Sequence, residues 1–265
     1  MASAESLSAP VSPGENPKIF SSERGQRPVA ASLGLVPYGR AHDLQVHLRD
    51  CILRKRLPEV ILALEHPPVI TLGRRGDPAN ITVPDETLAN LGVEVHQIER
   101  GGDVTYHGPG QLVLYPIMRI DRSVRAHVAA MAQAATEVLA DLGIEAAWDN
   151  DRPGLWVDNR KIAAIGVHVH HGVAIHGLAV NLSTDLSGFD LIVPCGLRDA
   201  GVTSVAEQQG RSPNPADLSE VLITRFLEAS HRPTAHFLRD FELFSYLHEQ
   251  DCPFDGEKAA DRNGR

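Results

Sequence analysis

Short apolar runs rich in β-branched residues recur in the first half of the chain and predict strands. They are VILALEH (60–66), VEVHQI (93–98) and QLVLYPIM (111–118), each with glycine or proline nearby. From residue 124 the apolar positions recur every three or four residues, which predicts a helix with Ser123 as N-cap and Gly143 as stop. The apolar stripe of that helix consists of Val124, Val128, Met131, Ala135, Val138, Leu139 and Leu142.

A second helix is predicted to start at Asn214-Pro215, because asparagine caps helices and proline suits the first turn. Weaker helical patterns cover residues 41–57 and 233–248. Strands outnumber helices and do not alternate regularly with them, so the predicted fold class is α+β, a mixed β-sheet flanked by helices rather than a Rossmann fold. The second helix should bury Leu218, Val221, Leu222 and Phe226.

The stretch KIAAIGVHVHHGVAIHGLAVNL (161–182) predicts a β-hairpin whose two-residue turn is His171-Gly172. This turn pairs Val169 with Ala174 and Val167 with His176. It places Lys161 on the more apolar face, where burial favours the neutral amine. A loop one residue longer or shorter would move every side chain to the opposite face.

Composition excludes several classes of protein. The chain has 265 residues, of which 43% are apolar and 22% charged, which is ordinary for a globular protein and unlike a fibrous or disordered one. A formal charge of -9 disfavours a nucleic-acid-binding surface. No run approaches the roughly 18 apolar residues of a membrane span, so no membrane association is expected. Three distant cysteines without a CxxC pair predict no disulfide framework and a cytoplasmic location.

The two ends of the chain differ in composition from its centre. Residues 1–28 are rich in Ser, Pro and Gly and predict a disordered extension, and they lack the basic start and apolar core of a secretory signal. Their glutamates also argue against an organelle transit peptide. We therefore expect a single catalytic domain over residues 29–250 and a flexible tail over 251–265.

The segment ERGGDVTYHGPGQ (99–111) combines two glycine pairs with Arg100, Tyr106 and His107. Backbone N–H groups in such a loop can hold an oxyanion or a polar acyl-carrier fragment, and a plain turn between strands is the alternative. The segment matches neither the GxxxxGK[ST] nor the GxGxxG phosphate loop.

Cysteine and histidine supply the remaining candidates. Cys195 lies between Pro194 and Gly196 on a predicted sharp turn, and it is either a small buried hydrophobe or a nucleophile that needs a base or cation beside it. None of the 13 histidines has the spacing of a metal site. His66 and His107 are candidates for substrate contacts or for structural hydrogen bonds.

Several motifs together resemble the lipoyl(octanoyl) transferases, which belong to the superfamily of biotin and lipoate protein ligases. The resemblance covers about residues 30 to 230. Its motifs are EHPPVITLG (65–73), RGGDVTYHGPGQLVLYP (100–116), PGLWV (153–157), KIAAIGV with HGLAVNL (161–182), PCGL (194–197) and GVTS (201–204).

The resemblance implies a catalytic domain of the biotin/lipoate protein ligase type. It implies that octanoyl-acyl carrier protein donates an octanoyl group, with Cys195 as nucleophile and Lys161 as its dyad partner, and it implies no cofactor and no metal. The implied acceptors are lipoyl domains of 2-oxoacid dehydrogenase complexes and the glycine cleavage H protein. The implied substrate-site residues are Arg100, Gly101, Gly102, Asp103, Val104, Thr105, Tyr106, His107, Ala164, Ile165, Gly166, Gly177, Leu178 and Ala179.

The role of Lys161 stays open at this level, because a nearby cation and a neutral amine would both favour the Cys195 thiolate. An acidic protein that meets an acidic carrier also needs a local positive patch. Candidates for that patch are Arg74, Arg75, Arg100, Arg152 and Arg160. Two other functions remain open: an ATP-dependent lipoate or biotin protein ligase, which needs no thiol at residue 195, and an acyl-binding protein without catalysis.

Overall fold

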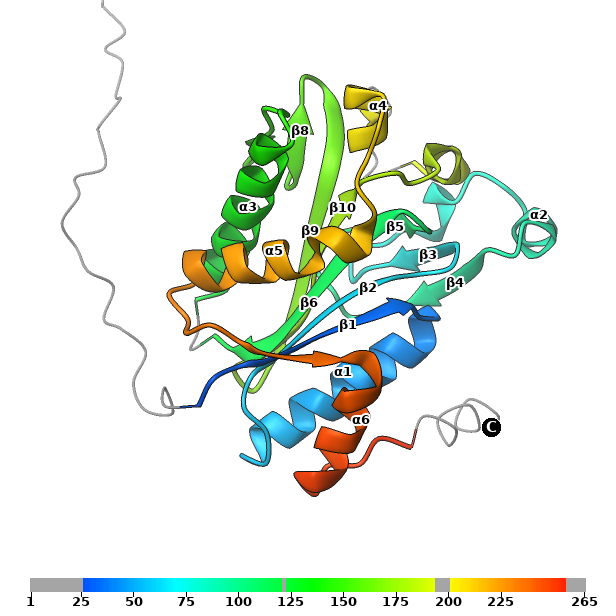
Figure 1. The fold of residues 1–265 in the computed structure, drawn as a ribbon. Coiled ribbons are helices and arrows are strands. Elements are labelled where there is room, and N and C mark those ends of the chain that lie inside the picture. Colours follow the sequence, from blue (N-terminus) through cyan, green and yellow to red (C-terminus); the bar gives the residue numbers. More distant parts are fainter. Residues whose placement is uncertain (1–25, 121–122, 194–200, 256–265) are drawn as a thin grey trace, which may run out of the picture.

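A nine-stranded mixed sheet forms the centre of the computed structural model, which describes residues 26–120, 123–193 and 201–255 (Figure 1). The strand pairs β12–β1, β1–β2 and β11–β9 are parallel and the others are antiparallel, so the predicted α+β class with a mixed sheet is confirmed. The order across the sheet is β12 (His236–Arg239), β1 (Val29–Leu35), β2 (Val60–Glu65), β6 (Gln111–Arg119), β10 (Val173–Asn181), β9 (Arg160–His170), β8 (Leu155–Val157) and β7 (Ala147–Trp148), and β11 (Gly201–Val202) pairs with β9.

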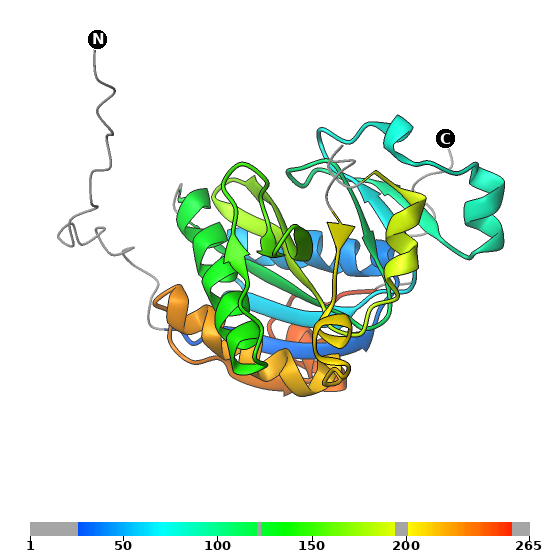
Figure 2. The same cartoon turned by 90° about the horizontal axis from the view of Figure 1, so that it is seen from above.

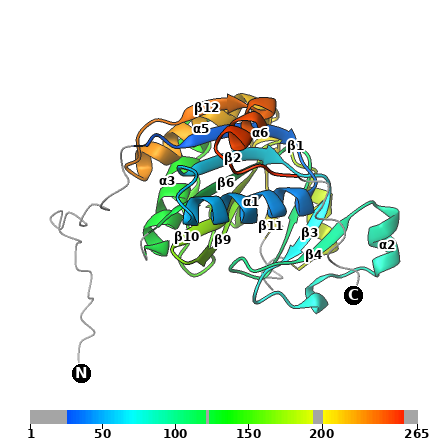
Figure 3. The ribbon, with the colours of Figure 1, turned by 90° about the horizontal axis from the view of Figure 1, so that it is seen from below.

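Helices cover both faces of this sheet. On one face α3 (Val124–Asp141) and α5 (Pro215–Ala229) pack over a core that contains Met131 and Phe226 (Figure 2). On the other face α1 (Tyr38–Leu53) and α6 (Asp240–Glu249) pack over a second core around Leu48 (Figure 3). Because both faces are buried, the central strands β2, β6 and β10 consist almost entirely of buried residues.

A three-stranded sheet lies beside the main sheet and carries the glycine-rich loop. Its order is β4 (Glu94–Gln97), β3 (Val69–Leu72) and β5 (Val104–His107), and its small core includes Ile70, Tyr106 and Phe189. β5 leads directly into β6 of the main sheet, so the two sheets are joined at this loop. The short elements are η1 (Pro78–Asn80), α2 (Asp85–Asn90), η2 (Leu186–Leu191) and α4 (Val205–Gln209).

The predicted hairpin is confirmed residue by residue. Val169 pairs with Ala174 and Val167 with His176. The turn residues His171 and Gly172 both have positive φ, 48° and 82°, as a two-residue type I′ turn requires.

The two predicted helices are also confirmed, with local differences. α5 begins at Pro215, and the Asn214 side chain accepts a hydrogen bond from the Ala216 N–H. Ser123 precedes α3 but its hydroxyl makes no capping hydrogen bond. Burial was wrongly expected for Val221, which is 40% exposed on the outer side of α5. Within the described ranges, no helix has both the length and the apolar character needed to cross a membrane.

The helical pattern over 233–248 is only half right. Residues His236–Arg239 form β12, and the helix α6 starts at Asp240. β12 pairs with β1, whose outer edge would otherwise lack backbone hydrogen-bond partners. The pattern over 41–57 is confirmed by α1, which begins at Tyr38 and ends at Leu53.

A disulfide joins Cys51 of α1 to Cys252, although the number and spacing of the cysteines predicted no disulfide framework. The two residues lie 201 positions apart, so only the packing of the C-terminal segment against α1 brings them together. Cys252 is 2% exposed and Phe254 packs against the same core. Ordered packing therefore continues past the expected boundary at residue 250.

The buried His127 on α3 should make stability depend on pH. Burial lowers the pKa of His127 from 6.5 to about 4, and its Nε2 has no hydrogen-bond partner. The unfolded chain therefore binds the proton more readily, so stability present above pH 6.5 is lost as the pH falls toward 4. Between pH 7 and pH 5 this loss amounts to about 2 kcal/mol.

We expect His127→Leu to flatten the dependence of the unfolding free energy on pH over this range, as measured by urea denaturation. The exposed His170 supplies the matched control, His170→Leu. An unchanged slope in His127→Leu would show that His127 does not titrate as proposed.

Candidate functional site

A cavity of 410 Å³ lies where the two sheets meet, a size that suits a small molecule. Its walls come from the glycine-rich loop, β6, β9, β10 and the start of β11. Tyr106 is not part of the lining; its ring packs on Phe189 in the small core instead. The other predicted substrate-site residues all line the cavity: Arg100, Gly101, Gly102, Asp103, Val104, Thr105, His107, Ala164, Ile165, Gly166, Gly177, Leu178 and Ala179.

Lys161 lies at the wall of this cavity near the start of β9. Its Nζ donates a hydrogen bond to the Pro153 carbonyl oxygen at 3.1 Å and lies 4.9 Å from the centre of the Trp156 ring. The side chain is half-buried, so the apolar face predicted for β9 holds for Ile165, Val167 and Val169 but ends before Lys161.

Cys195 lies outside the described residues, but the chain on both sides of it is placed. Before it, the Val193 N–H donates to the Asn80 carbonyl oxygen. After it, Val202 pairs with Lys161 in a parallel ladder, and the Thr203 N–H donates to the Lys161 carbonyl oxygen. The chain that follows Cys195 is thus hydrogen-bonded directly to Lys161.

Arg100 lines the cavity and also holds the glycine-rich loop in place. Its guanidinium donates to the Thr71 carbonyl oxygen at 2.7 Å, to the Thr71 hydroxyl and to the Gly101 carbonyl oxygen. The Gly101 N–H donates to the Val167 carbonyl oxygen on β9, so that N–H does not serve an oxyanion, contrary to what the glycine pattern suggested.

Asp103 also has a positioning role. Its carboxylate accepts hydrogen bonds from the Asp77 N–H and from the Asn80 side-chain amide. Since Asn80 is the residue that binds the Val193 N–H, Asp103 connects the glycine-rich loop to the chain that precedes Cys195.

A buried polar network crosses the sheets at the cavity wall. His107 Nδ1 lies 2.6 Å from the side-chain oxygen Oε1 of Gln111, and the side-chain amide of Gln111 donates to Asn181 Oδ1. The side-chain amide of Asn181 in turn donates to the backbone carbonyl oxygen of Thr203. Burial lowers the pKa of His107 to about 3, so the ring is neutral. Gln111, Asn181 and Thr203 were not among the predicted site residues; the signal that could have found them is their polar character within strongly apolar strands.

His66 is a structural residue, which decides between its two predicted roles. The ring is fully buried and does not line the cavity. Its Nδ1 lies 2.7 Å from the Val36 carbonyl oxygen and its Nε2 lies 2.7 Å from the Tyr115 hydroxyl. Burial lowers the pKa of His66 to about 4, in agreement with a neutral ring that donates through one nitrogen and accepts through the other.

The middle of β10 is distorted opposite a proline. Pro116 of β6 has no N–H for the ladder, and the pairing of β10 with β6 is interrupted between Ala174 and Leu178. Within the gap His176 has a φ of 61°, and its N–H donates to the Gln45 side chain of α1 at 2.8 Å. At the following Gly177, a Cβ would collide with the Leu114 carbonyl oxygen, so only glycine fits.

As a consequence, the His176 side chain lies toward α1 and Glu99 instead of joining the core under α3. Glu99 immediately precedes Arg100 and lies 3.2 Å from His42 Nε2. The imidazoles of His176 and His42 hold the pKa of the Glu99 carboxyl well below its usual range. Sequence patterns placed His176 on the opposite face because alternation assumes a regular strand.

The predicted positive patch is reduced to two residues. Arg152 pairs with Asp149 and lies over the Trp156 ring, and Arg160 pairs with Glu207. Arg74 and Arg75 are exposed, form no salt bridge within the described part of the chain, and Arg75 lines the cavity. Their backbone N–H groups donate to the carbonyl oxygens of Arg100 and Gly102, which fixes both arginines at the rim of the glycine-rich loop.

Comparison with known proteins identifies relatives over most of the chain. A curated octanoyltransferase of Solibacter usitatus is 45% identical over 216 residues, which cover 80% of this chain and 92% of that protein. An octanoyltransferase of Myxococcus xanthus is 47% identical over 177 residues, 63% of this chain; the matched region is half of that protein's length.

Solved structures show the same fold. A crystal structure of lipoate-protein ligase A bound with ATP superposes with a TM-score of 0.61 at 17% identity and covers 83% of this chain and 94% of that chain. Residues 37–227 match the family described as the lipoyl protein ligase A/B catalytic domain. The matched region includes the residues that line the cavity, and the octanoyltransferase of Solibacter usitatus aligns over most of the chain. The chain therefore belongs to the lipoyl protein ligase A/B catalytic domain family.

Proposed function

We propose that this protein transfers an octanoyl group from octanoyl-acyl carrier protein to a lysine of a lipoyl domain, through a thioester on Cys195 and with the help of Lys161. The observation that carries the proposal is the ladder between Val202 and Lys161 at the wall of the cavity. This backbone pairing holds the segment that follows Cys195 against Lys161, the lysine that the mechanism needs. The octanoyltransferase relatives support the choice of acyl group.

In the first step the Cys195 thiolate attacks the carbonyl carbon of the carrier thioester. A new sulfur–carbon bond forms, the carrier's sulfur leaves as a thiolate, and that thiolate takes up a proton. One thioester replaces another, so the step is close to energetically neutral. The apolar residues Ile165, Leu178 and Phe189 in the cavity lining provide contacts for the hydrocarbon chain.

In the second step the amine of the acceptor lysine attacks the Cys195 thioester. An amide bond forms, Cys195 leaves as a thiolate, and the attacking nitrogen gives up a proton that Lys161 can accept as a neutral amine. Amide formation from a thioester is strongly downhill, so the reaction needs no ATP.

The proposed acceptors are lipoyl domains of 2-oxoacid dehydrogenase complexes and the glycine cleavage H protein, and the proposed location is the cytoplasm. A lipoyl domain is a folded partner that must bring its lysine to the cavity. The acidic acyl carrier needs a positively charged surface on this protein, whose formal charge is -9. The exposed Arg74 and Arg75 at the cavity rim provide that surface.

The proposal is tested by intact-protein mass spectrometry. Mixed with octanoyl-acyl carrier protein alone, the protein should gain one octanoyl group, and added apo-lipoyl domain should then take that group over without ATP. Modification of the lipoyl domain from free octanoate and ATP, with none from the carrier thioester, would instead identify a ligase. Binding of the acyl carrier without any transfer would identify an acyl-binding protein.

Charge reversal at Arg74 and Arg75 should weaken use of the acidic carrier. Because both charges lie at the cavity rim, Arg74→Glu with Arg75→Glu should lower kcat/KM for octanoyl-acyl carrier protein by about 10-fold or more, about 1.4 kcal/mol. A small octanoyl thioester has no acidic surface, so its kcat/KM should change little.

The matched control is Arg125→Glu with Arg211→Glu, which makes the same change in net charge at two exposed arginines outside the cavity lining. Equal losses with both donors, or an equal effect of the control pair, would show that the rim does not recognise the carrier.

A further inference from the structure

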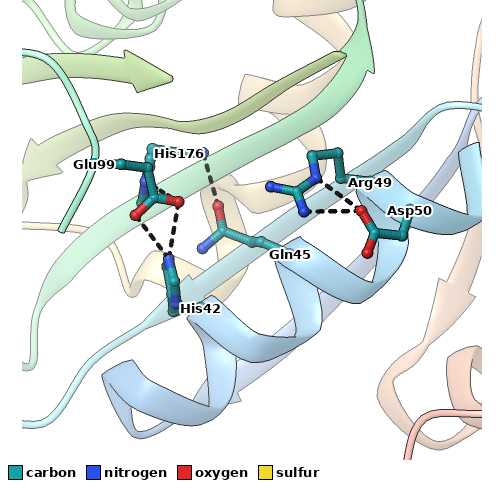
Figure 4. Close-up of polar contacts among 6 residues, drawn as sticks. All are labelled: His42, Gln45, Arg49, Asp50, Glu99 and His176. Carbon is teal, nitrogen blue, oxygen red and sulfur yellow. Dashed lines mark hydrogen bonds and ion pairs between the residues drawn. The ribbon is translucent and has the colours of Figure 1, made fainter. Parts of the chain in front are cut away.

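Three side chains from separate elements converge beside the cavity: His42 from α1, Glu99 from the segment after β4, and His176 from the distorted centre of β10 (Figure 4). His42 Nε2 lies 3.2 Å from each Glu99 carboxylate oxygen, and His176 Nε2 lies 3.7 Å from the nearer one. The two imidazole rings are stacked with their centres 5.6 Å apart. All three ligand atoms lie within 4.8 Å of one another.

The His176 nitrogen that faces this cluster has no hydrogen-bond partner. His176 is 2% exposed, and its Nε2 is buried and unsatisfied within the described structure, since 3.7 Å is too long for a hydrogen bond. A buried polar atom without a partner is costly and requires an explanation. The strand distortion opposite Pro116 and the hydrogen bond from the His176 N–H to Gln45 together hold the ring in this position.

Neighbouring cations do not occupy the place that a ligand would take. The guanidinium of Arg49 pairs with the Asp50 carboxylate at 2.8 Å, as Figure 4 shows. The guanidinium of Arg100 donates to Thr71 and Gly101. Among the described residues, the Glu99 carboxylate is therefore left to the two imidazoles.

We propose that His42, Glu99 and His176 bind a divalent transition-metal ion of the zinc type. Two imidazole nitrogens and one carboxylate oxygen are a ligand set that zinc uses with a fourth position open to water. Bond lengths of about 2.0–2.2 Å to a tetrahedral ion separate the ligand atoms by about 3.3–3.5 Å. The observed separations of 3.2 and 3.7 Å lie on either side of that range.

A metal ion can reach this site from solvent, and the site lies at the cavity wall. The side chains of His42 and Glu99 are 24% and 32% exposed, so an ion can enter from solvent between them. His176 lines the cavity, and Glu99 is joined to Arg100 of the glycine-rich loop. A bound ion would tie α1, this loop and β10 to one point at the cavity wall.

A second group of possible ligands consists of His47, Cys51 and Cys252. The two cysteines form the disulfide, so their sulfurs offer no thiolate while the bond is intact. Experiments on the oxidised protein therefore test the first cluster without competition from the second.

The test is a titration of the full-length, oxidised and chelator-treated protein with Co²⁺, followed by its visible absorption, and with Zn²⁺, followed by calorimetry. We expect one ion per chain, the absorption bands of four- or five-coordinate Co²⁺, and no sulfur-to-cobalt charge-transfer band. Loss of an outer partner of a metal site weakens binding by about 10- to 100-fold. His42→Gln and Glu99→Gln remove direct ligands and should weaken it by at least that much.

The control is His96→Gln, which removes a histidine that pairs with Glu94 at 2.8 Å on the exposed strand β4. This variant should bind the metal like the unaltered protein. Thermal unfolding without metal reports whether each variant is folded, and added Zn²⁺ should raise the Tm of the His96→Gln protein but not that of His42→Gln. Failure of the unaltered protein to bind, a charge-transfer band from a cysteine, or unchanged affinity in folded His42→Gln would overturn the proposal.

Discussion

Replacement of Cys195 by alanine is expected to abolish octanoyl transfer, with a loss in kcat of at least about 10⁴-fold, the scale seen when a covalent nucleophile is removed. The proposed reaction passes through a thioester that only a sulfur at this position can form. Cys195→Ser should also lose nearly all activity, because a thiol with a pKa of about 8.5 is a few per cent ionised at pH 7, whereas a hydroxyl is hardly ionised at all. Transfer is measured as the mass gain of an apo-lipoyl domain.

The matched control removes the other two cysteines. Cys51→Ser with Cys252→Ser leaves Cys195 as the single thiol, because the chain has three cysteines in all. This variant lacks the disulfide and should be assayed below its own unfolding temperature, where it should still form the octanoyl adduct. Adducts that map to another residue, or transfer by folded Cys195→Ala, would contradict the covalent mechanism.

Lys161 should be nearly as important as the nucleophile. Lys161→Ala removes both a cation and a proton acceptor from the cavity wall, and we expect kcat to fall by about 10²- to 10⁴-fold, the usual contribution of general acid–base catalysis. Lys161→Arg keeps the positive charge, but a guanidinium does not release its proton near neutral pH. The arginine variant should therefore fail in the aminolysis step.

Two measurements separate the possible roles of Lys161. The rate of Cys195 alkylation as a function of pH reports how far Lys161 favours the thiolate, and single-turnover transfer from preformed octanoyl-protein reports aminolysis alone. Lys55→Arg, at an exposed lysine outside the cavity lining, is the control. Near-normal turnover by Lys161→Arg would mean that Lys161 acts through its charge and does not accept a proton.

Local patterns were sufficient for the regular parts of this fold. The turn at His171-Gly172, the start of α5 at Asn214-Pro215 and most of the apolar stripe of α3 were predicted correctly because each depends on neighbours in the sequence. Val124 of that stripe is an exception, because it is 40% exposed. The motif resemblance also located the cavity, since the matched segments at 100–116, 153–157, 161–182 and 201–204 supply most of its lining. Whether these residues bind the acyl group remains a prediction.

Features that depend on distant partners could not be predicted in this way. β12 is a strand because β1 offers it an open edge, and the Cys51–Cys252 bond depends on two segments 201 residues apart. The structural role of Arg100 was not predictable either, because nothing in the sequence shows that Thr71 accepts its hydrogen bonds. His176 left the expected face because the proline across from it interrupts the ladder.

The covalent link between Cys51 and Cys252 closes nearly the whole domain into a ring. A protease that cut one exposed loop between these residues would produce two fragments that stay joined, and each would keep its partner strands within reach. The cavity draws its walls from segments on both sides of most such cuts. Resistance to nicking would then last as long as the surroundings stay oxidising, and a reductant would let the fragments separate.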